Sequence, residues 1–229
     1  MNLTDILGKA EGFLRKSKNA LIRKSDPQFR EVEKWYREDP RGLKRSEFEF
    51  LTPESIVFDL GGYLGEWTSN LYSRYNCKIH IFEPVKEYAD IIAHRFSHNK
   101  RITVVQAGLA SADLETFITL DEFESKVVGS DHAIHKTEPI RLKAFQQYVS
   151  QTGIDKIDLV KINIEGAEYD LLDHLISTGQ TERINCFLIQ FHNWEQNATT
   201  RREKIRQELS KTHTEVFNYS FVWECWQKK

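Results

Sequence analysis

The stretch VFDLGGYLGEW, residues 57–67, places three glycines between an apolar run and an amphipathic one. Glycine adopts backbone conformations closed to other residues and lets a ligand approach the main chain, so a glycine turn after a strand can cradle a cofactor. A plain tight turn uses glycine in the same way. Asp59 precedes Gly61 by two residues, and the resulting pattern is D-x-G-G-x-x-G rather than the G-x-G-x-x-G of dinucleotide-binding turns.

A second feature is Glu83, which ends the apolar run IHIFEP 22 residues after Gly61. An acidic side chain at this distance from a glycine turn can accept hydrogen bonds from both hydroxyls of an adenosine ribose. A surface carboxylate at the end of a strand is the alternative. The pairing with the glycine turn favours ribose binding, and it therefore predicts a cofactor that contains a nucleoside.

NAD and S-adenosylmethionine are the two cofactors that compete for this site. A pyrophosphate binds the free amides of a G-x-G-x-x-G helix start, whereas here the turn is followed at once by Glu66. The carboxylates of Asp59 and Glu83 suit a cation better than a diphosphate. We therefore expect S-adenosylmethionine, with Asp59 near its ammonium group, directly or through water. A carboxylate that only orders the glycine turn is the alternative for Asp59.

The elements that position these residues follow from an alternation of apolar, β-branched runs with amphipathic segments after Pro53. This alternation predicts an α/β fold with βαβ crossovers, a mostly parallel sheet and helices on both faces. Around the glycine turn we expect a strand at 56–60 and a helix from about residue 66. Two closely spaced strands in residues 214–227 predict an antiparallel hairpin at one edge. We interpret residues 121–138 as a polar insertion that acts as a lid or acceptor-binding loop.

The N-terminal segment has a different character. Apolar residues recur at helical spacing from Leu3 to Ile22, with basic residues along the same segment. A helix that packs on the domain is the favoured interpretation, and contact with an anionic membrane surface or a partner is the alternative. A second short helix is expected from Phe29 to Arg37.

Bulk composition narrows the class of protein further. The chain has 229 residues, which suits one α/β domain with an appendage, and its net charge of -2 predicts no nucleic-acid partner. Three widely spaced cysteines indicate neither a zinc site nor a disulfide framework. No apolar stretch approaches the roughly 20 residues of a membrane helix, and we expect a cytoplasmic protein. The oligomeric state stays open, with Trp223 and Trp226 on the hairpin as a candidate interface.

A third motif, IDLVKINIEGAEYDLL at residues 157–172, makes the chain resemble a known family. Taken with VFDLGGYLG, IFEP and IRLKAFQQYVSQTGIDK, it resembles the FkbM family of S-adenosylmethionine-dependent methyltransferases over about residues 55–192. The resemblance implies a Rossmann-like class I methyltransferase fold, a seven-stranded sheet whose last strand is antiparallel. With the change of sequence character near Pro53, we expect a helical N-terminal extension, residues 1–50, and a methyltransferase domain, residues 51–229. Members typically O-methylate hydroxyls of sugars or natural products.

The resemblance also implies roles for individual residues of the cofactor site. The glycine turn with Asp59 holds the methionine end of the cofactor, Glu83 holds the ribose, and two residues after the third strand flank the adenine. Asn163 lies at the tip of the fourth strand, near the reactive sulfonium. The expected cofactor-binding set is Asp59, Gly61, Gly62, Tyr63, Gly65, Glu83, Gln106, Ala107 and Asn163.

Three positions depart from the pattern of the family. Asn163 stands where members usually have Asp, Tyr63 replaces a small or polar turn residue, and Gln190 stands where Glu is frequent. Two of these changes remove negative charge near the expected site. They raise the alternative that the chain binds the cofactor but has lost methyl transfer.

Catalysis requires that an acceptor hydroxyl lose its proton, which the amide of Asn163 cannot take. His192, in QFHNW just past the fifth strand, is the best remaining base by type and position. A histidine held only by neighbouring hydrogen bonds is the alternative. Glu165 is a candidate for orienting His192 or the acceptor, unless Glu165 and Glu168 simply complement the N-terminus of the following helix. The expected catalytic set is therefore His192, Asn163 and Glu165.

Lys161 and a possible metal site are two further candidates for special roles. Lys161 lies on a strand expected to be buried, where a lone ammonium is costly, so we expect it to pair with Asp59 or Glu168 and to be structural. A divalent metal is another route to an activated hydroxyl. Its conceivable ligands are Asp131, His132, His135 and His192. Because H-x-x-H has no third ligand at diagnostic spacing, no metal is expected.

The sequence thus predicts an S-adenosylmethionine-dependent methyltransferase that transfers the methyl group by direct displacement to a hydroxyl of a small sugar or natural-product acceptor. A non-catalytic cofactor-binding member of the family is the first alternative. An NAD-dependent oxidoreductase is the second, and the glycine pattern disfavours it.

Overall fold

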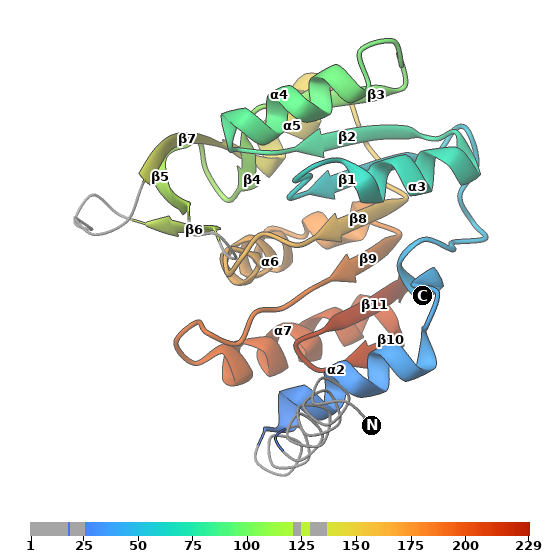
Figure 1. Cartoon of the computed structure of the whole chain (residues 1–229), viewed down its shortest axis with the longest axis vertical. Coiled ribbons are helices and arrows are strands. Elements are labelled where there is room, and N and C mark those ends of the chain that lie inside the picture. Colours follow the sequence, from blue (N-terminus) through green and yellow to red (C-terminus); the bar gives the residue numbers. More distant parts are fainter. Residues whose placement is uncertain (1–17, 19–25, 121–124, 129–136) are drawn as a thin grey trace, which may run out of the picture.

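The described part of the computed structural model, residue 18 and residues 26–120, 125–128 and 137–229, contains a central sheet of seven strands in the order β10-β11-β9-β8-β1-β2-β3. Strand β11 is antiparallel to both of its neighbours, whereas β1, β2, β3, β8 and β9 are mutually parallel. The strands are β1 (Ile56–Leu60), β2 (Lys78–Phe82), β3 (Ile102–Val105), β8 (Leu159–Ile162), β9 (Cys186–Ile189), β10 (His213–Tyr219) and β11 (Trp223–Lys228). The expected class I methyltransferase topology is confirmed. Because parallel strands end together, the tips of β1, β2, β8 and β9 form one edge (Figure 1).

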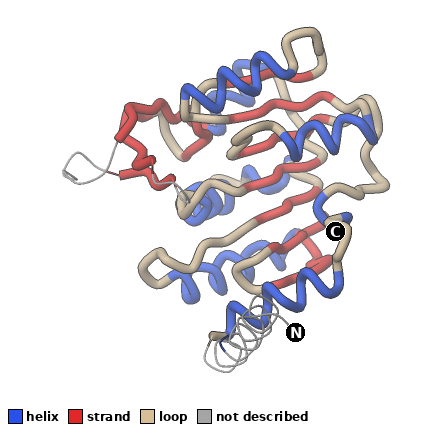
Figure 2. Tube along the Cα trace, in the orientation of Figure 1, coloured by secondary structure: helices blue, strands red, loops and turns tan. Residues whose placement is uncertain are grey.

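Helices cover both faces of this sheet (Figure 2), which explains why its inner strands β1, β8 and β9 are almost completely buried. Alternate residues face opposite sides: Phe58 and Val160 lie in the core cluster under α5, α6 and α7, while Val57 and Leu159 lie in the cluster under α2, α3 and α4. The helices are α2 (Pro27–Glu38), α3 (Glu66–Tyr75), α4 (Lys86–Arg95), α5 (Phe145–Thr152), α6 (Glu168–Ser177) and α7 (Ala198–Thr212), with 3-10 turns at Leu43–Arg45 and Gln180–Arg183.

A second, four-stranded sheet lies beside the tips of the central strands, in the order β4-β7-β5-β6 (Figure 1). Its strands are β4 (Gly108–Ala110), β5 (Leu114–Leu120), β6 (Ser125–Val128) and β7 (Thr137–Ala144). One face packs against α4, because Ile118 and Ile140 form a small apolar cluster with Val85 and Tyr88. The polar insertion expected at 121–138 is therefore in part the β6 strand and the start of β7, and its remaining residues lie outside the described chain.

The N-terminal and C-terminal segments pack against each other. Helix α2 covers the short helix expected at Phe29–Arg37, and its Trp35 contacts the ring of Tyr219 edge-on with the ring centroids 5.0 Å apart. The helix expected at residues 3–22 lies outside the described residues apart from Lys18. Only 6% of Trp223 and 3% of Trp226 is exposed. The interpretation of these two tryptophans as an exposed interface is wrong, because β11 lies inside the sheet between β9 and β10.

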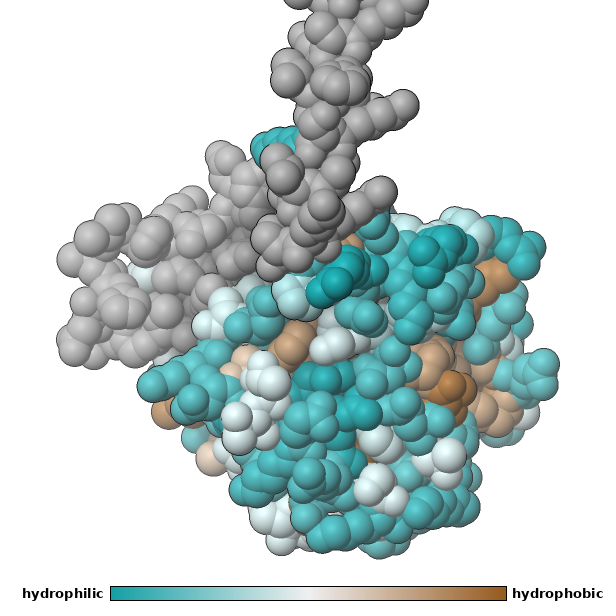
Figure 3. Space-filling view, turned by 90° about the horizontal axis from the view of Figure 1, so that it is seen from below, coloured by the Kyte–Doolittle hydropathy of each residue, from teal (hydrophilic) through white to brown (hydrophobic). Residues whose placement is uncertain are grey.

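The surface around this end of the molecule is mostly hydrophilic, with separate apolar patches (Figure 3). Within the described residues, no helix combines the length and the apolar character that crossing a membrane requires.

Candidate functional site

The glycine turn lies at the edge where the central strands end, clamped between β2 and β8. The N–H groups of Gly61 and Gly62 both donate to the carbonyl of Phe82, at 3.0 and 3.3 Å. Gly61 has φ +80°, and a Cβ added there would lie 2.0 Å from the carbonyl oxygen of Asn163. A side chain at Gly62 would lie 2.3 Å from Ile81. The close approach of two strands thus requires glycine at both positions.

Asp59 and Lys161 form a buried ion pair behind the turn. Lys161 Nζ lies 3.0 Å from Asp59 Oδ1 and also donates to the carbonyls of Gly61, at 2.7 Å, and Leu60, at 3.3 Å. Thr68 donates to the other carboxylate oxygen at 2.7 Å, and Asp59 is completely buried. The expected pairing of Lys161 with Asp59 is confirmed. Because Asp59 is completely buried behind the turn, between Lys161 and Thr68, this geometry supports its role in ordering the turn rather than direct contact with an ammonium group.

Glu83 lies immediately past β2 and faces the glycine turn. Its carboxylate accepts the backbone N–H of Tyr63 at 2.8 Å and that of Val85 at 3.0 Å. Burial raises the pKa of Glu83 from 4.5 to about 7, against the opposing effect of these two hydrogen bonds. Each oxygen keeps one unused lone pair, so Glu83 can still accept the two hydroxyls of a ribose.

The raised pKa of Glu83 predicts a specific pH dependence of stability. A carboxyl group that binds its proton more tightly in the folded state favours folding fully below the unfolded pKa of 4.5, and this advantage is lost as pH rises to about 7. The shift corresponds to about 3 kcal/mol. Glu83→Gln should therefore remove most of a decline in unfolding free energy between about pH 4.5 and 8, measured by urea denaturation. Glu49→Gln, at an exposed carboxylate, should leave the decline unchanged, and an unchanged decline in Glu83→Gln would contradict the assignment.

The two residues expected to flank the adenine, Gln106 and Ala107, differ in their exposure to solvent. Gln106 and Ala107 follow β3 directly, but Ala107 is only 1% exposed, while Gln106 is exposed. Gln106 lines an open cavity of about 590 Å³ together with the first turns of α4 and the start of β7. Tyr63 has φ 49° and is 58% exposed, with its ring centroid 4.8 Å from that of Tyr88. An aromatic pair therefore stands over the turn, beside the expected ribose position.

Asn163 has a buried side-chain oxygen, Oδ1, that lacks a hydrogen-bond partner among the described residues. Its backbone N–H donates to Leu60 at 3.1 Å, which holds it at the tip of β8. Leaving a buried acceptor unpaired costs about 1–3 kcal/mol, so this position suits a ligand that brings a donor.

His192 lies at the same edge, past β9, and is held between two carboxylates. Its Nδ1 is 3.0 Å from Glu168 Oε1 and its Nε2 is 3.3 Å from Glu165 Oε2. Glu168 Oε1 also accepts the His192 backbone N–H at 2.8 Å, and Oε2 accepts that of Gly166 at 2.8 Å. Because Glu168 acts only as an acceptor, Nδ1 is the ring nitrogen that donates. Nε2 is then directed toward Glu165, whose side chain is one-third exposed.

Two aromatic rings fix the orientation of His192. Tyr169 donates its hydroxyl to the His192 carbonyl at 2.6 Å, and the ring of Trp194 lies at 4.3 Å from the imidazole. Gln190 is anchored by its backbone N–H to Ile162 at 2.9 Å. The structure thus brings the expected residues together in two groups, one around the glycine turn and one around His192.

Comparison with known proteins shows the family. The methyltransferase FkbM domain matches residues 59–221 of the 229 residues. The chain belongs to the FkbM methyltransferase family. A search of curated protein sequences finds no match.

Solved structures agree with the fold of an FkbM methyltransferase. A candidate rRNA methylase from Clostridium thermocellum superposes with a TM-score of 0.50 at 12% identity, over 82% of this chain and 94% of that one. A candidate methyltransferase from Streptococcus mutans, in complex with S-adenosylhomocysteine, has a TM-score of 0.47 at 10% identity, over 78% of this chain and 91% of that one. At 12% identity, the similarity to the Clostridium thermocellum structure shows the fold alone.

In this FkbM chain, the contact of Glu168 with His192 is the feature of the site that the sequence did not predict. Glu168 was expected to complement the start of α6 or to pair with Lys161, yet it is fully buried and hydrogen-bonds both the backbone and the ring of His192. The available signal was its place in E-G-A-E, directly after the turn at Gly166, which has φ 103°. The described residues contain no group of three or more potential ligands that could hold a metal ion. Asp131, His132 and His135 lie outside them.

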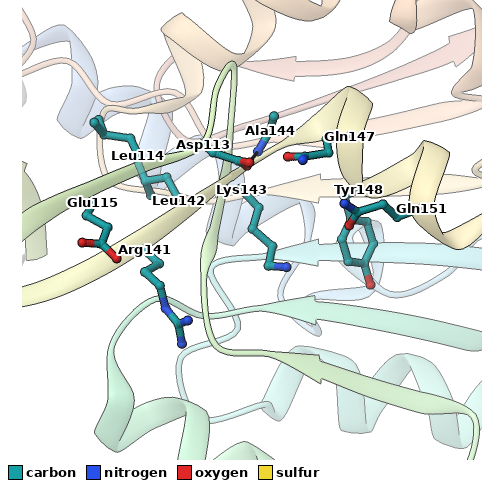
Figure 4. A pocket seen from close by; sticks show the side chains of 10 residues that line it. All are labelled: Asp113, Leu114, Glu115, Arg141, Leu142, Lys143, Ala144, Gln147, Tyr148 and Gln151. Atoms are coloured by element: carbon teal, nitrogen blue, oxygen red, sulfur yellow. Dashed lines mark hydrogen bonds between the residues drawn. The ribbon is translucent and has the colours of Figure 1, made fainter.

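A separate cavity of about 360 Å³ lies between the second sheet and α5 (Figure 4). Its lining combines acidic side chains, Asp113 and Glu115, with basic ones, Arg141 and Lys143. None of the residues expected to bind the cofactor or the acceptor lines it. The charges of this cavity balance, and it has no direct connection to the chemistry of the two groups described above.

Proposed function

We propose that the chain is an S-adenosylmethionine-dependent O-methyltransferase that acts on a hydroxyl of a small sugar or natural-product acceptor. The observation that carries the proposal is His192, whose Nδ1 is engaged by buried Glu168 while Nε2 remains directed toward the partly exposed Glu165. A general base needs a ring fixed at one nitrogen and a second nitrogen that faces the reacting proton. Glu168 fixes the ring at Nδ1, and Glu165, 3.3 Å from Nε2, has to move aside for Nε2 to meet the acceptor hydroxyl.

Three features of the chain fit the cofactor. The glycine turn offers main chain without side chains, Glu83 offers two acceptor oxygens beside it, and the orphan Oδ1 of Asn163 requires a donor. When bound, S-adenosylmethionine supplies an electrophilic methyl group on a sulfonium. The contribution of the chain is to hold that group and the acceptor oxygen in line, from which most of the rate of a displacement can come.

His192 supplies the acid–base chemistry. Nε2 accepts the proton of the acceptor hydroxyl as the oxygen attacks, and the resulting imidazolium lies between the carboxylates of Glu165 and Glu168, which stabilise its charge. Asn163 has no basic atom, so its role is to donate or accept a hydrogen bond. Lys161 forms an ion pair with Asp59, so its role is structural.

A non-catalytic cofactor-binding protein is the second candidate. The neutral side chains of Asn163 and Gln190 favour it, since the family usually carries a carboxylate at these positions. Release of S-adenosylhomocysteine in the presence of hydroxylated acceptors separates the two candidates, because cofactor binding alone gives no product.

Calorimetric titration tests the cofactor assignment. We expect saturable binding of S-adenosylmethionine and none of NAD. The affinity should fall by roughly tenfold or more in Glu83→Ala, because two ribose hydroxyls lose their acceptors. Glu49→Gln is the matched control at an exposed carboxylate and should bind as the wild type does. Binding of NAD instead, or equal affinity in a folded Glu83→Ala, would overturn the assignment.

A further inference from the structure

A cavity of about 770 Å³ lies between the C-terminal ends of α3 and α4. Both helices begin at the edge that carries the glycine turn and Glu83, and both run toward the opposite edge of the sheet (Figure 1). Each has 10 residues, which corresponds to about 15 Å of helix. This α3–α4 cavity is therefore separate from the proposed methyl-transfer site, and its function does not depend on that proposal.

The charge of the α3–α4 cavity is of one sign. Its lining includes Arg95, His98, Lys100 and Arg101 and contains no aspartate or glutamate. The cavity of Figure 4, with Asp113 and Glu115 beside its cations, lacks this property. A hollow whose charged side chains are all basic concentrates the field and attracts anions, even though the whole chain has a net charge of -2.

Among the residues that the structure describes, the cations of the cavity have one weak carboxylate partner. It is Glu54, 4.0 Å from Arg101 Nη2, and its side chain is 78% exposed, so water and salt weaken that pair. Arg101 donates through Nη1 to the carbonyl of Pro53, and Arg95 lies within 3.4 Å of the Ser69 hydroxyl. These contacts are to neutral groups. Within the described chain, Lys100 has no carboxylate partner.

Aromatic rings form the apolar part of the lining. Tyr72 and Phe96 line the cavity and pack against the core cluster beneath α3 and α4. A Cβ added to Gly65 would lie 3.0 Å from the ring of Phe96, which shows how tightly that ring is held. Fixed aromatic rings beside guanidinium and ammonium groups are the elements that bind a base and its phosphate in single-stranded nucleic acids.

We propose that the α3–α4 cavity binds a nucleotide phosphate, with Arg95, Lys100 and Arg101 contacting the phosphate oxygens and Tyr72 or Phe96 supporting the base. Guanidinium groups match phosphate oxygens in a two-pronged geometry, and Lys100 adds a point charge. A free nucleotide and a single-stranded nucleic acid share this chemistry. Site and ligand form no covalent bond, and the cavity holds the nucleotide away from the methyl-transfer edge.

Fluorescence anisotropy of a short fluorescein-labelled oligouridine tests the proposal. The double variant Arg95→Glu with Lys100→Glu should bind it roughly tenfold or more weakly than the full wild-type chain. The slope of log affinity against log salt should also decrease by roughly 1.4, for two lost phosphate contacts. The matched control is Arg141→Glu with Lys143→Glu, which makes the same change of net charge at exposed cations on β7. This control variant retains the basic N-terminal segment and should bind the oligouridine as the wild type does.

Calorimetry with uridine monophosphate and with inorganic phosphate distinguishes the sources of the ligand. Equal affinity for the nucleotide and the oligouridine supports a free nucleotide as the occupant, and a tighter oligouridine supports a nucleic-acid strand. Equal weakening by the two double variants would overturn the proposal in favour of long-range attraction. Absence of binding to all three probes by the wild type would overturn it as well. Unchanged thermal unfolding of the variants shows that the cavity, rather than the fold, was altered.

Discussion

Lys161→Met should lower the free energy of unfolding by about 3–5 kcal/mol, the cost of breaking a buried ion pair by removing one partner. Methionine has similar length, but among the described residues it leaves the fully buried carboxylate of Asp59 with Thr68 as its one remaining side-chain donor. The carbonyls of Gly61 and Leu60 lose a donor too. Urea denaturation measures the change.

A double-mutant cycle provides the control for Lys161→Met. Replacing both partners, Asp59→Leu with Lys161→Met, removes the uncompensated charge, so the double variant should be more stable than Lys161→Met alone. Lys78→Met at an exposed lysine should change stability by about 0.5 kcal/mol or less. If the two single effects simply added in the double variant, the ion pair would not be the source of the cost.

His192→Gln should lower kcat by about 10²–10⁴, the usual contribution of a positioned general base. Glutamine preserves hydrogen bonding to Glu168 but cannot take a proton from a hydroxyl. Release of S-adenosylhomocysteine with an acceptor found by screening gives kcat, and calorimetry should give an unchanged affinity for S-adenosylmethionine. His94→Gln, at an exposed histidine in the last turn of α4, is the matched control and should leave both quantities unchanged.

Glu168→Gln separates positioning from catalysis at His192. The wild-type imidazole should carry its proton on Nδ1, because Glu168 accepts there, and nitrogen–proton correlation spectra of the ring report this directly. In Glu168→Gln the tautomer preference should weaken and kcat should fall, while cofactor binding persists. Full activity of a folded His192→Gln would contradict the assignment of the base, whatever the tautomer.

The central sheet was predictable from the sequence because its strands are buried on both faces. Runs such as IVFDL and INCFLIQF are apolar at successive positions, which only a sheet covered on both sides requires. The glycine turn was equally predictable. Gly61 and Gly65 both adopt positive φ angles, which amino acids other than glycine rarely adopt. The expected strand 56–60 and the helix from residue 66 match β1 and α3.

The contacts that define the chemistry could not be predicted from spacing alone. His192 and Glu168 are 24 residues apart on different elements, so only the docking of α6 against β9 brings the imidazole to the buried carboxylate. The sequence could not decide whether Asp59 binds the ammonium group of the cofactor or only orders the glycine turn. The positions of Lys161 and Thr68, which hydrogen-bond its two oxygens, favour the second role. The second sheet was not predicted from the sequence, because its strands are half exposed and interrupted by polar residues.

The ion pair behind the glycine turn also bears on when the proposed cofactor site forms during folding. Asp59 and Lys161 are 102 residues apart, and the carbonyl of Asn163 limits the space at Gly61 from the same distant strand. Contacts of such long sequence separation form late, because a large loop must close first. A nascent chain that contains only β1 to β3 therefore possesses the complete glycine motif without a site. The motif becomes a binding surface at the moment β8 inserts beside β1.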